Sequence, residues 1–144
     1  MTRSQRISSV LKLAERKEKN AARVAIETRQ KLHMYESKLN ELRQFRSEYS
    51  IDFTSTDHAM TSNLLRERQQ FLHQVDAGIR ILTNTVEGHR HTSHIDDKTW
   101  MEAYKYSHAL DKLVDKVRSF ELHIDEMREE NELDDRSQHR KVKI

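Results

Sequence analysis

Apolar residues recur in alternating steps of four and three along the first third of the chain. Stepping in this way from Ile7 to Phe53 gives fourteen positions, of which eleven carry apolar or aromatic side chains. A 3.5-residue repeat of this length is typical of a helix that supercoils with a partner helix. The repeat therefore predicts a coiled-coil seam rather than a globular core. Its positions are Ile7, Leu11, Ala14, Glu18, Ala21, Ala25, Thr28, Leu32, Tyr35, Leu39, Leu42, Arg46, Tyr49 and Phe53.

The second half of the chain carries a similar but interrupted repeat. It begins at Leu65, Arg68, Leu72, Val75, Ile79, Leu82 and Val86, and it weakens through the polar residues 87–94. It returns at Trp100 and, after one three-residue step, continues at Ala103, Tyr106, Leu110, Leu113, Val117, Phe120, Ile124 and Met127. A three-residue step in place of four is a stammer, which overwinds a coil locally. The second half therefore predicts a second long helix with one change of register.

Composition excludes the main alternatives to a helical coil. The 144 residues include no Pro, no Cys and two Gly, and 35% of them are charged. Sheets need Gly- and Pro-rich turns, and zero Cys excludes a disulfide framework, a thiolate metal site and a cysteine nucleophile. We expect one all-α domain, 1–144: helices over about 4–52 and 63–135, a turn over 54–62, and a polar tail over 136–144. A short link makes the two helices an antiparallel hairpin, and Thr61-Ser62-Asn63 offers capping oxygens for the second helix.

The two predicted helices differ in length, so part of the second is expected to lack a partner. If the chain folds back near Asp57, Ser4 faces roughly Leu110. The apolar run from Leu113 to Met127 then lies beyond the reach of the first helix. A bare stripe of this length usually marks a binding surface.

The charges and the hydropathy leave several partners open. Residues 1–46 carry 12 basic and 5 acidic side chains, which would suit nucleic acid or an anionic membrane surface. Pairing with acidic residues of the second helix explains the same charges. The sequence starts without a signal peptide, and no stretch is long and apolar enough to span a membrane. We therefore expect a cytoplasmic protein.

Sites for chemistry are sparse in the sequence. His89, His91 and His94, with Asp97 beyond them, have spacings that could supply metal ligands on a helix. The alternative is a solvated stretch where the seam is polar, which we prefer, so we expect no metal site. Two helices side by side offer no concave pocket for catalysis, and the sequence lacks a phosphate-binding glycine loop. We expect neither an enzyme nor a cofactor.

A set of short segments, in order along most of the chain, resembles the FliJ family. FliJ is the small coiled-coil component of the bacterial flagellar type III export apparatus. The Glu-Tyr before the turn and the Gln-Phe-Leu after it are the most specific of these segments. The segments are Leu11-Lys12-Leu13-Ala14-Glu15, Ala21-Ala22-Arg23, Leu39-Asn40-Glu41-Leu42, Ser47-Glu48-Tyr49, Gln70-Phe71-Leu72 with Val75 and Ile79, and Trp100 with Leu110 and Leu113.

The resemblance implies an antiparallel coiled coil similar to the central stalk of rotary ATPases. It further implies a non-catalytic protein at the inner face of the cell membrane. Its partners would be the hexameric export ATPase and the cytoplasmic domain of the export gate, with export chaperones as a further class. A generic coiled-coil adapter, the equivalent stalk of a virulence secretion system and a nucleic-acid-binding hairpin remain alternatives.

Two sets of residues are the predicted partner-binding surfaces. Phe71 widens the apolar stripe beyond what a two-helix seam needs, so its neighbourhood is assigned to the export gate. The unpaired run of the second helix, with the basic start of the first, is assigned to the ATPase ring. The gate set is Phe71, Val75 and Leu82, and the ATPase set is Arg3, Arg6, Leu113, Val117, Phe120, Ile124 and Met127.

Overall fold

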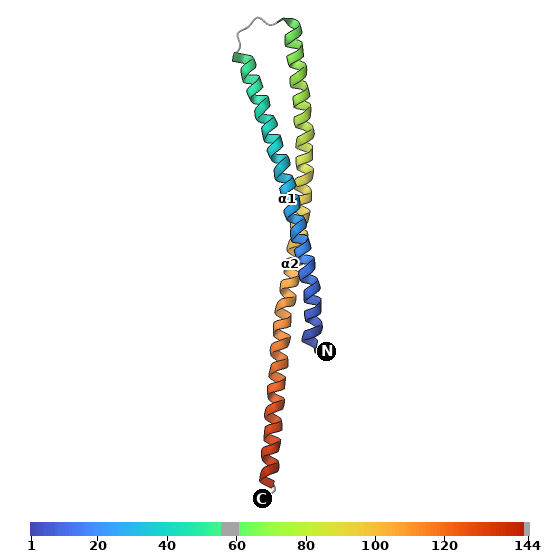
Figure 1. Ribbon diagram of the computed structural model, residues 1–144, viewed down its shortest axis with the longest axis vertical. Coiled ribbons are helices and arrows are strands. Elements are labelled where there is room, and N and C mark those ends of the chain that lie inside the picture. The colour runs from blue at the N-terminus through green and yellow to red at the C-terminus, as the bar shows by residue number, and fades with distance from the viewer. Residues whose placement is uncertain (56–60, 143–144) are drawn as a thin grey trace. The chain divides into compact units, whose positions relative to one another are not determined.

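The computed structural model describes residues 1–55 and 61–142, with side chains for residues 1–51 and 61–141. These residues form two helices, α1 (Arg3–Ser55) and α2 (Ser62–Val142), and include no strand. The helices pack against each other in opposite directions (Figure 1), which confirms the predicted two-helix hairpin. Most of the predicted turn over 54–62, and the side chain of Phe53, lie outside the described residues.

The chain divides into two compact units, each built from a segment of both helices. Unit 1 comprises Met1–Asn20 and Met101–Ile144, and unit 2 comprises Ala21–Trp100. Each unit is a pair of antiparallel helix segments with its own buried seam. The single domain predicted from sequence is therefore described below as these two units, each by itself.

Polar side chains cap the starts of both helices. At α1, the Thr2 hydroxyl accepts from the Gln5 amide (3.3 Å) while the Gln5 side chain accepts from the Thr2 amide (3.1 Å). This reciprocal pair satisfies two backbone donors that a helix start leaves free. At α2, Thr61 accepts from the amide of Leu64 (3.4 Å), so a residue of the predicted capping segment does cap the helix.

The end of α2 differs from the sequence-based expectation. The helix continues to Val142, whereas a polar tail is predicted after Asp135. No Pro or Gly follows Gly88 to stop the helix. His139, Arg140 and Lys141 occupy the last turn, where positive charge interacts favourably with the helix dipole.

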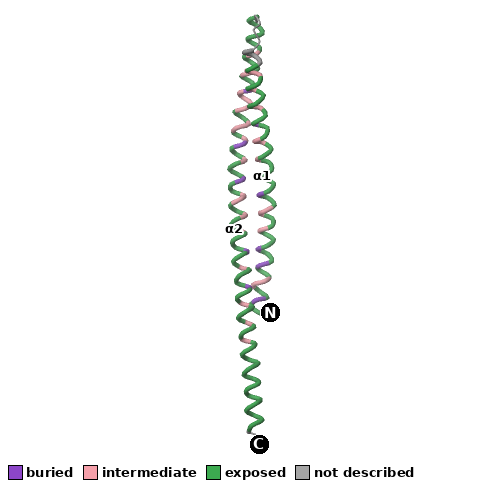
Figure 2. The backbone as a smooth tube through the Cα atoms, turned by 90° about the vertical axis from the view of Figure 1, so that its left-hand side faces the viewer, coloured by how far each residue is buried: buried purple, intermediate pink, exposed green. Residues whose placement is uncertain are grey.

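The predicted seam of α1 is confirmed. Every position of the repeat whose side chain is described is buried or half-buried, from Ile7 to Tyr49. The most buried are Leu11, Ala14, Ala25 and Leu39, each at most 8% exposed. Figure 2 shows the buried positions of α1 on the side that faces α2. Small side chains at Ala14 and Ala25 allow the two backbones to approach closely.

The seam of α2 follows a different register from the predicted one after Trp100. Val114 is 2% exposed, whereas Leu113 is 42% and Phe120 63% exposed. The buried and half-buried positions continue in unbroken steps of four and three, so the described α2 has no stammer. These positions include Val75, Val86, Ser93, Trp100, Ser107, Val114, Val117, Glu121 and Ile124.

The physical reason for this correction is the size of the residues involved. The predicted register chose the large apolar side chains, but small or polar ones, such as Ser93 and Ser107, fit between closely packed helices. Both serines are only 6% exposed. Leu113 and Phe120 lie one position away from the seam and form its edge.

The stagger of the two helices also differs from the prediction. Ser4 contacts Glu121 rather than a residue near Leu110. The helices are therefore paired as if the chain turned back near the start of α2, later than the Asp57 assumed from sequence. α1 covers α2 as far as Glu121, so the prediction that the whole run from Leu113 to Met127 is unpaired is wrong. The unpaired part, residues 122–142, is called the overhang below.

Two further features bear on function. Within the described residues, neither helix has a stretch apolar and long enough to cross a membrane. Gly88 lies inside α2 in unit 2, and a Cβ built on it would meet no atom within 4 Å. Gly78, in contrast, faces Leu42, whose Cδ2 would lie 3.7 Å from such a Cβ.

Candidate partner-binding surfaces

An aromatic cluster joins the two helices of unit 2 near its linked end. Phe71 of α2 contacts Phe45 edge-on (6.3 Å between ring centroids) and Tyr49 in a tilted arrangement (5.1 Å). The guanidinium of Arg68 lies 5.8 Å from the Tyr49 ring, within cation–π range. The Phe45 and Phe71 side chains are 47% and 39% exposed. The cluster therefore presents aromatic surface to solvent while it links α1 to α2.

The three residues predicted for the gate surface do not share one face. Phe71 is exposed, but Val75 is buried at 9% and Leu82 is half-buried in the seam. Sequence reasoning missed Phe45 and Tyr49, which lie beside Phe71. The Glu-Tyr segment of α1 was the available signal, because it precedes the predicted turn by a few residues and Phe71 follows the same turn on the opposite helix.

The residues predicted for the ATPase surface form a stripe along α2 of unit 1. Leu113, Phe120 and Met127 are 42%, 63% and 50% exposed, while Val117 and Ile124 are half-buried beside the seam. We call these five residues the unit 1 stripe. As far as Glu121 it is one side of the predicted bare seam, because α1 covers the other side, and Ile124 and Met127 continue it onto the overhang.

A shallow hollow of about 370 Å³ lies at the middle of the unit 1 stripe. It is lined by Val117, Phe120 and Ile124, together with Lys116, Arg3 and Glu121. The α1 residue Arg3 therefore lies next to the stripe, as predicted. Arg6 is exposed nearby, and its guanidinium donates to the Met1 carbonyl (3.4 Å). The hollow combines apolar walls with two basic side chains and one acidic side chain, and Glu121 is held by Ser4.

Glu121 caps the start of α1 from the opposite helix. Its carboxylate accepts hydrogen bonds from the Ser4 amide (3.1 Å) and the Ser4 hydroxyl (2.7 Å). These two bonds lower the pKa of Glu121 below its ordinary value. A negative charge at a helix N-terminus is also favoured by the helix dipole. The contact fixes where α1 begins against α2.

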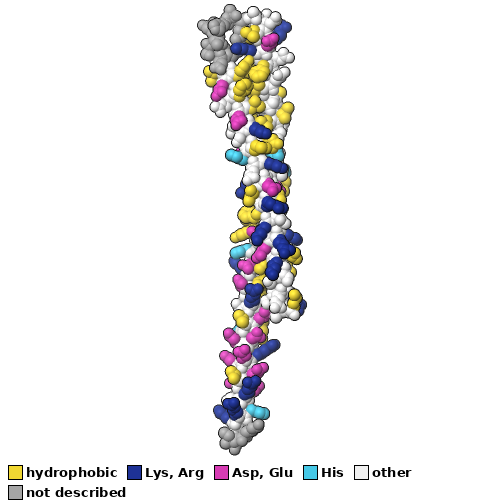
Figure 3. Space-filling view, in the orientation of Figure 1, with side chains coloured by type: hydrophobic (Ala, Val, Ile, Leu, Met, Phe, Trp, Pro, Cys, Tyr) yellow, Lys and Arg dark blue, Asp and Glu magenta, His cyan; other side chains and the backbone are white. Residues whose placement is uncertain are grey.

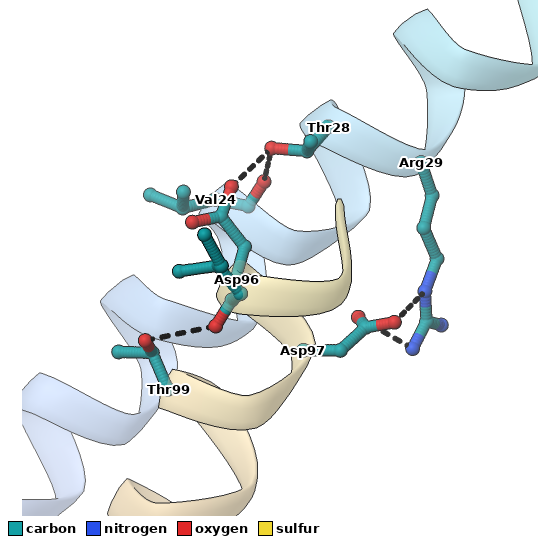
Figure 4. Close-up of polar contacts among 7 residues, drawn as sticks. Val24, Thr28, Arg29, Asp96, Asp97 and Thr99 are labelled. Carbon is teal, nitrogen blue, oxygen red and sulfur yellow. Dashed lines mark hydrogen bonds and ion pairs between the residues drawn. The ribbon is translucent and has the colours of Figure 1, made fainter. Parts of the chain in front are cut away.

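A polar layer crosses the seam of unit 2 close to the two ends of the unit, Ala21 and Trp100 (Figure 4). The Thr28 hydroxyl lies 2.7 Å from the Asp96 carboxylate and 2.8 Å from the Val24 carbonyl. Beside it, Arg29 of α1 pairs with Asp97 of α2 at 2.8 Å. Polar groups in a coiled-coil seam favour one register over its neighbours, because any shift leaves them unpaired. The layer therefore positions α1 along α2.

Two more ion pairs cross between the helices of unit 2. Arg46 binds Asp76 at 2.9 Å, and Arg90 binds Glu36 at 3.1 Å. The hydrogen bond from Arg46 lowers the pKa of Asp76. Part of the positive charge of α1 is thus paired with acidic side chains of α2. This pairing was the alternative to nucleic-acid binding as an explanation of the basic residues.

The histidines considered as metal ligands point to different neighbours. His89 stacks on Tyr35 of α1 at 4.5 Å, and Asp97 is engaged by Arg29. His91 and His94 are exposed. Across the part of the chain that the structure describes, no three His, Cys, Asp or Glu side chains are placed to hold a metal ion.

Comparison with known proteins gives one match. The family model described as "Flagellar FliJ protein" matches residues 3–142, nearly the whole chain. No curated protein and no solved structure matches the chain.

Proposed function

The chain belongs to the flagellar FliJ family and is a component of flagellar protein export, and from this premise we propose that it couples the export ATPase to the membrane export gate. It does so as a non-catalytic coiled coil that binds other proteins through its exposed faces. In this role it lies in the cytoplasm against the inner face of the membrane. Export chaperones are further partners of the same kind.

The observation that carries the proposal is the exposed unit 1 stripe. Leu113, Phe120 and Met127 stand open to solvent at successive heptad positions. Exposed apolar rows at this spacing accept another helix or a ring-shaped apolar surface. The charges of Arg3 and Lys116 beside the hollow would orient the partner. We assign this surface to the ATPase ring.

The aromatic cluster of unit 2 supports an assignment to the export gate. Phe45, Tyr49 and Phe71 present a compact aromatic surface, and aromatic residues dominate the energetics of many protein interfaces. Val75 and Leu82 support the cluster from within the seam. In this assignment Phe71 contacts the gate, and Val75 and Leu82 hold Phe71 in place.

ATPase stimulation tests the first assignment. Val117→Asp combined with Phe120→Asp should abolish stimulation of the export ATPase, because the partner would have to bury two charges. Leu122→Asp is the matched control, since Leu122 is 64% exposed but lies outside the stripe. Circular dichroism verifies that both variants keep their helices. Equal stimulation by the double variant and the control would refute the assignment.

Binding to the gate domain tests the second assignment. Phe71→Ala should weaken that binding and leave the helical content unchanged. The matched control is Ile81→Ala, because Ile81 is an exposed apolar residue of the same helix, 68% exposed. Loss of helical content in Phe71→Ala would instead make Phe71 a structural residue and contradict the assignment.

A further inference from the structure

The overhang of α2 begins with an acidic run, which the basic residues Arg136, Arg140 and Lys141 follow. Between residues 122 and 135 it carries seven acidic side chains and one Arg. Because α1 starts opposite Glu121, the overhang lies beyond it. The acids are Asp125, Glu126, Glu129, Glu130, Glu132, Asp134 and Asp135. Figure 3 shows acidic side chains gathered on the overhang and basic ones on the paired segment of unit 1.

The opposite charge lies along one side of the paired segment. Arg3 of α1 lines the same hollow as Phe120 of α2, so these residues flank one groove between the helices. Side chains seven residues apart lie in a row along a helix. Antiparallel pairing therefore continues the groove to Val10 beside Leu113 and to Lys17 beside Tyr106.

The composition of this groove is apolar with basic edges. Val10 is 44% exposed, Leu113 42% and Tyr106 58%, and each is free of large neighbours that would cover it. Lys17 and Lys116 stand along the edges and are solvated. Such a groove fits a helix with an apolar row and acidic flanks.

The overhang is a helix of that kind. Ile124 and Met127 continue the unit 1 stripe along it, and the acids occupy its remaining faces. The overhang cannot reach the groove of its own chain, because it is the straight continuation of α2, the helix that forms one side of that groove. The overhang of a second copy can reach it.

We propose that two copies of the chain pair in antiparallel fashion through unit 1, each placing its overhang in the basic groove of the other. The pair is symmetric about Phe120, which meets Phe120 of the second copy. Met127 then lies opposite Leu113 of the second copy, and the acidic run follows the groove towards Lys17 of the second copy. The arrangement covers both unit 1 stripes and joins opposite charges, as a closed two-fold interface requires. It would compete with any other partner of the stripe, but it does not depend on that partner's identity.

Sedimentation of the full chain tests the pairing. The average mass should rise with concentration from that of one 17.2 kDa chain towards that of two, over about 1 to about 200 µM. Phe120→Asp should weaken the association about tenfold or more, because it places two charges at the centre of the interface. Leu122→Asp, on another face, should leave it unchanged. A single-chain mass across the whole range would overturn the proposal.

Charge reversal tests the role of the groove separately from the apolar stripe. Lys17→Glu should weaken self-association, and so should Glu129→Lys combined with Glu130→Lys. A mixture of the two variants should associate more strongly than either variant alone, since in the mixed pair each overhang faces a groove residue of opposite charge. Added salt should weaken the unaltered pair. A mixture that associates no better than its components would contradict the assignment of the groove.

Cysteine cross-linking fixes the direction of pairing, because the natural chain has no Cys. Phe120→Cys should form a disulfide-linked dimer on oxidation, whereas Leu122→Cys should not. Met127→Cys alone should stay uncoupled, but a mixture of Met127→Cys and Leu113→Cys should couple, since a disulfide needs Cα atoms within about 7 Å. Efficient coupling of Met127→Cys with itself would indicate parallel pairing and refute the symmetry proposed here.

Discussion

The two units use the same heptad spacing but hold their helices together differently. In unit 2, ion pairs such as Arg46–Asp76 flank a seam that contains Leu39 and Val86. In unit 1, the helices are joined by hydrogen bonds between hydroxyls and carboxylates, Ser4 to Glu121 and Ser107 to Glu18. Unit 1 also leaves one side of its seam open. We therefore expect unit 2 to be the more stable part of the coil, and unit 1 to be the part that exposes a surface for a partner.

The largest expected effect comes from the buried leucines. Leu39→Ala in unit 2 should lower the free energy of unfolding by about 2–5 kcal/mol, because Leu39 is 5% exposed and its loss leaves a cavity. Leu11→Ala in unit 1, where Leu11 is 8% exposed, should cost less, since the start of α1 can separate without disrupting unit 2. Urea unfolding followed by circular dichroism measures both.

Leu13→Ala is the control for that experiment. Leu13 is 59% exposed, so its truncation should change stability by less than about 0.5 kcal/mol. Equal losses for Leu11→Ala and Leu39→Ala would show that the two units unfold as one and would break the comparison.

Loss of a polar contact across the seam should also lower the free energy of unfolding more in unit 2 than in unit 1, but by a smaller amount than loss of a leucine. Asp96→Ala removes the 2.7 Å acceptor of Thr28 in unit 2 and should cost about 1 kcal/mol. Glu18→Ala removes the 3.3 Å acceptor of Ser107 in unit 1, a longer and therefore weaker hydrogen bond. Its loss should therefore cost less. A larger loss for Glu18→Ala, measured by urea unfolding, would reverse the ranking of the two units.

The ion pairs should contribute less still. Arg29→Ala removes the ion pair with Asp97, in which the Arg29 side chain is 57% exposed. We therefore expect the free energy of unfolding to fall by about 0.2–1 kcal/mol at low salt. The difference from the unaltered chain should shrink as salt screens the pair. A difference that is independent of salt would mean that Arg29 acts through the packing of its aliphatic stem instead.

The smallest effect should be local and dependent on pH. Because hydrogen bonds from Ser4 lower the pKa of Glu121, the contact stabilises the start of α1 above the ordinary Glu value of 4.5. This stabilisation is lost as the pH falls through the lowered pKa. Hydrogen exchange of amides at the start of α1, corrected for intrinsic rates, should then show weaker protection. Glu121→Gln should remove the pH dependence, and an unchanged dependence would exclude Glu121 as its source.

The sequence predicted α1 more accurately than α2 for a physical reason. Along α1 the 3.5-residue repeat read from the sequence and the buried seam coincide, so Leu11, Leu39 and the alanines between them could be assigned from spacing. Along α2 they diverge after Trp100, where Ser107 and Val114 enter the seam and larger neighbours remain outside. Hydrophobicity alone cannot show this, because the choice depends on how closely α1 approaches.

The candidate surfaces were predictable in part. Phe71 and the five residues of the unit 1 stripe were identified from sequence, and the structure places Phe71 and three of the five in solvent. The contacts of Phe71 with Phe45 and Tyr49 could not be predicted, because they depend on how far the two helices are shifted along each other. The sequence-based prediction put the point where the chain turns back too early. The binding roles of these residues remain predictions, to be decided by the variants above.

Gly88 has a mechanical consequence for α2. Packing does not require a glycine there, because a side chain would meet nothing. A glycine inside a helix costs about 1 kcal/mol relative to alanine, and it leaves the backbone freer to depart from ideal helical angles. The helix is therefore more compliant at this turn than along its neighbours, so bending strain applied to unit 2 would concentrate next to the stacked rings of Tyr35 and His89.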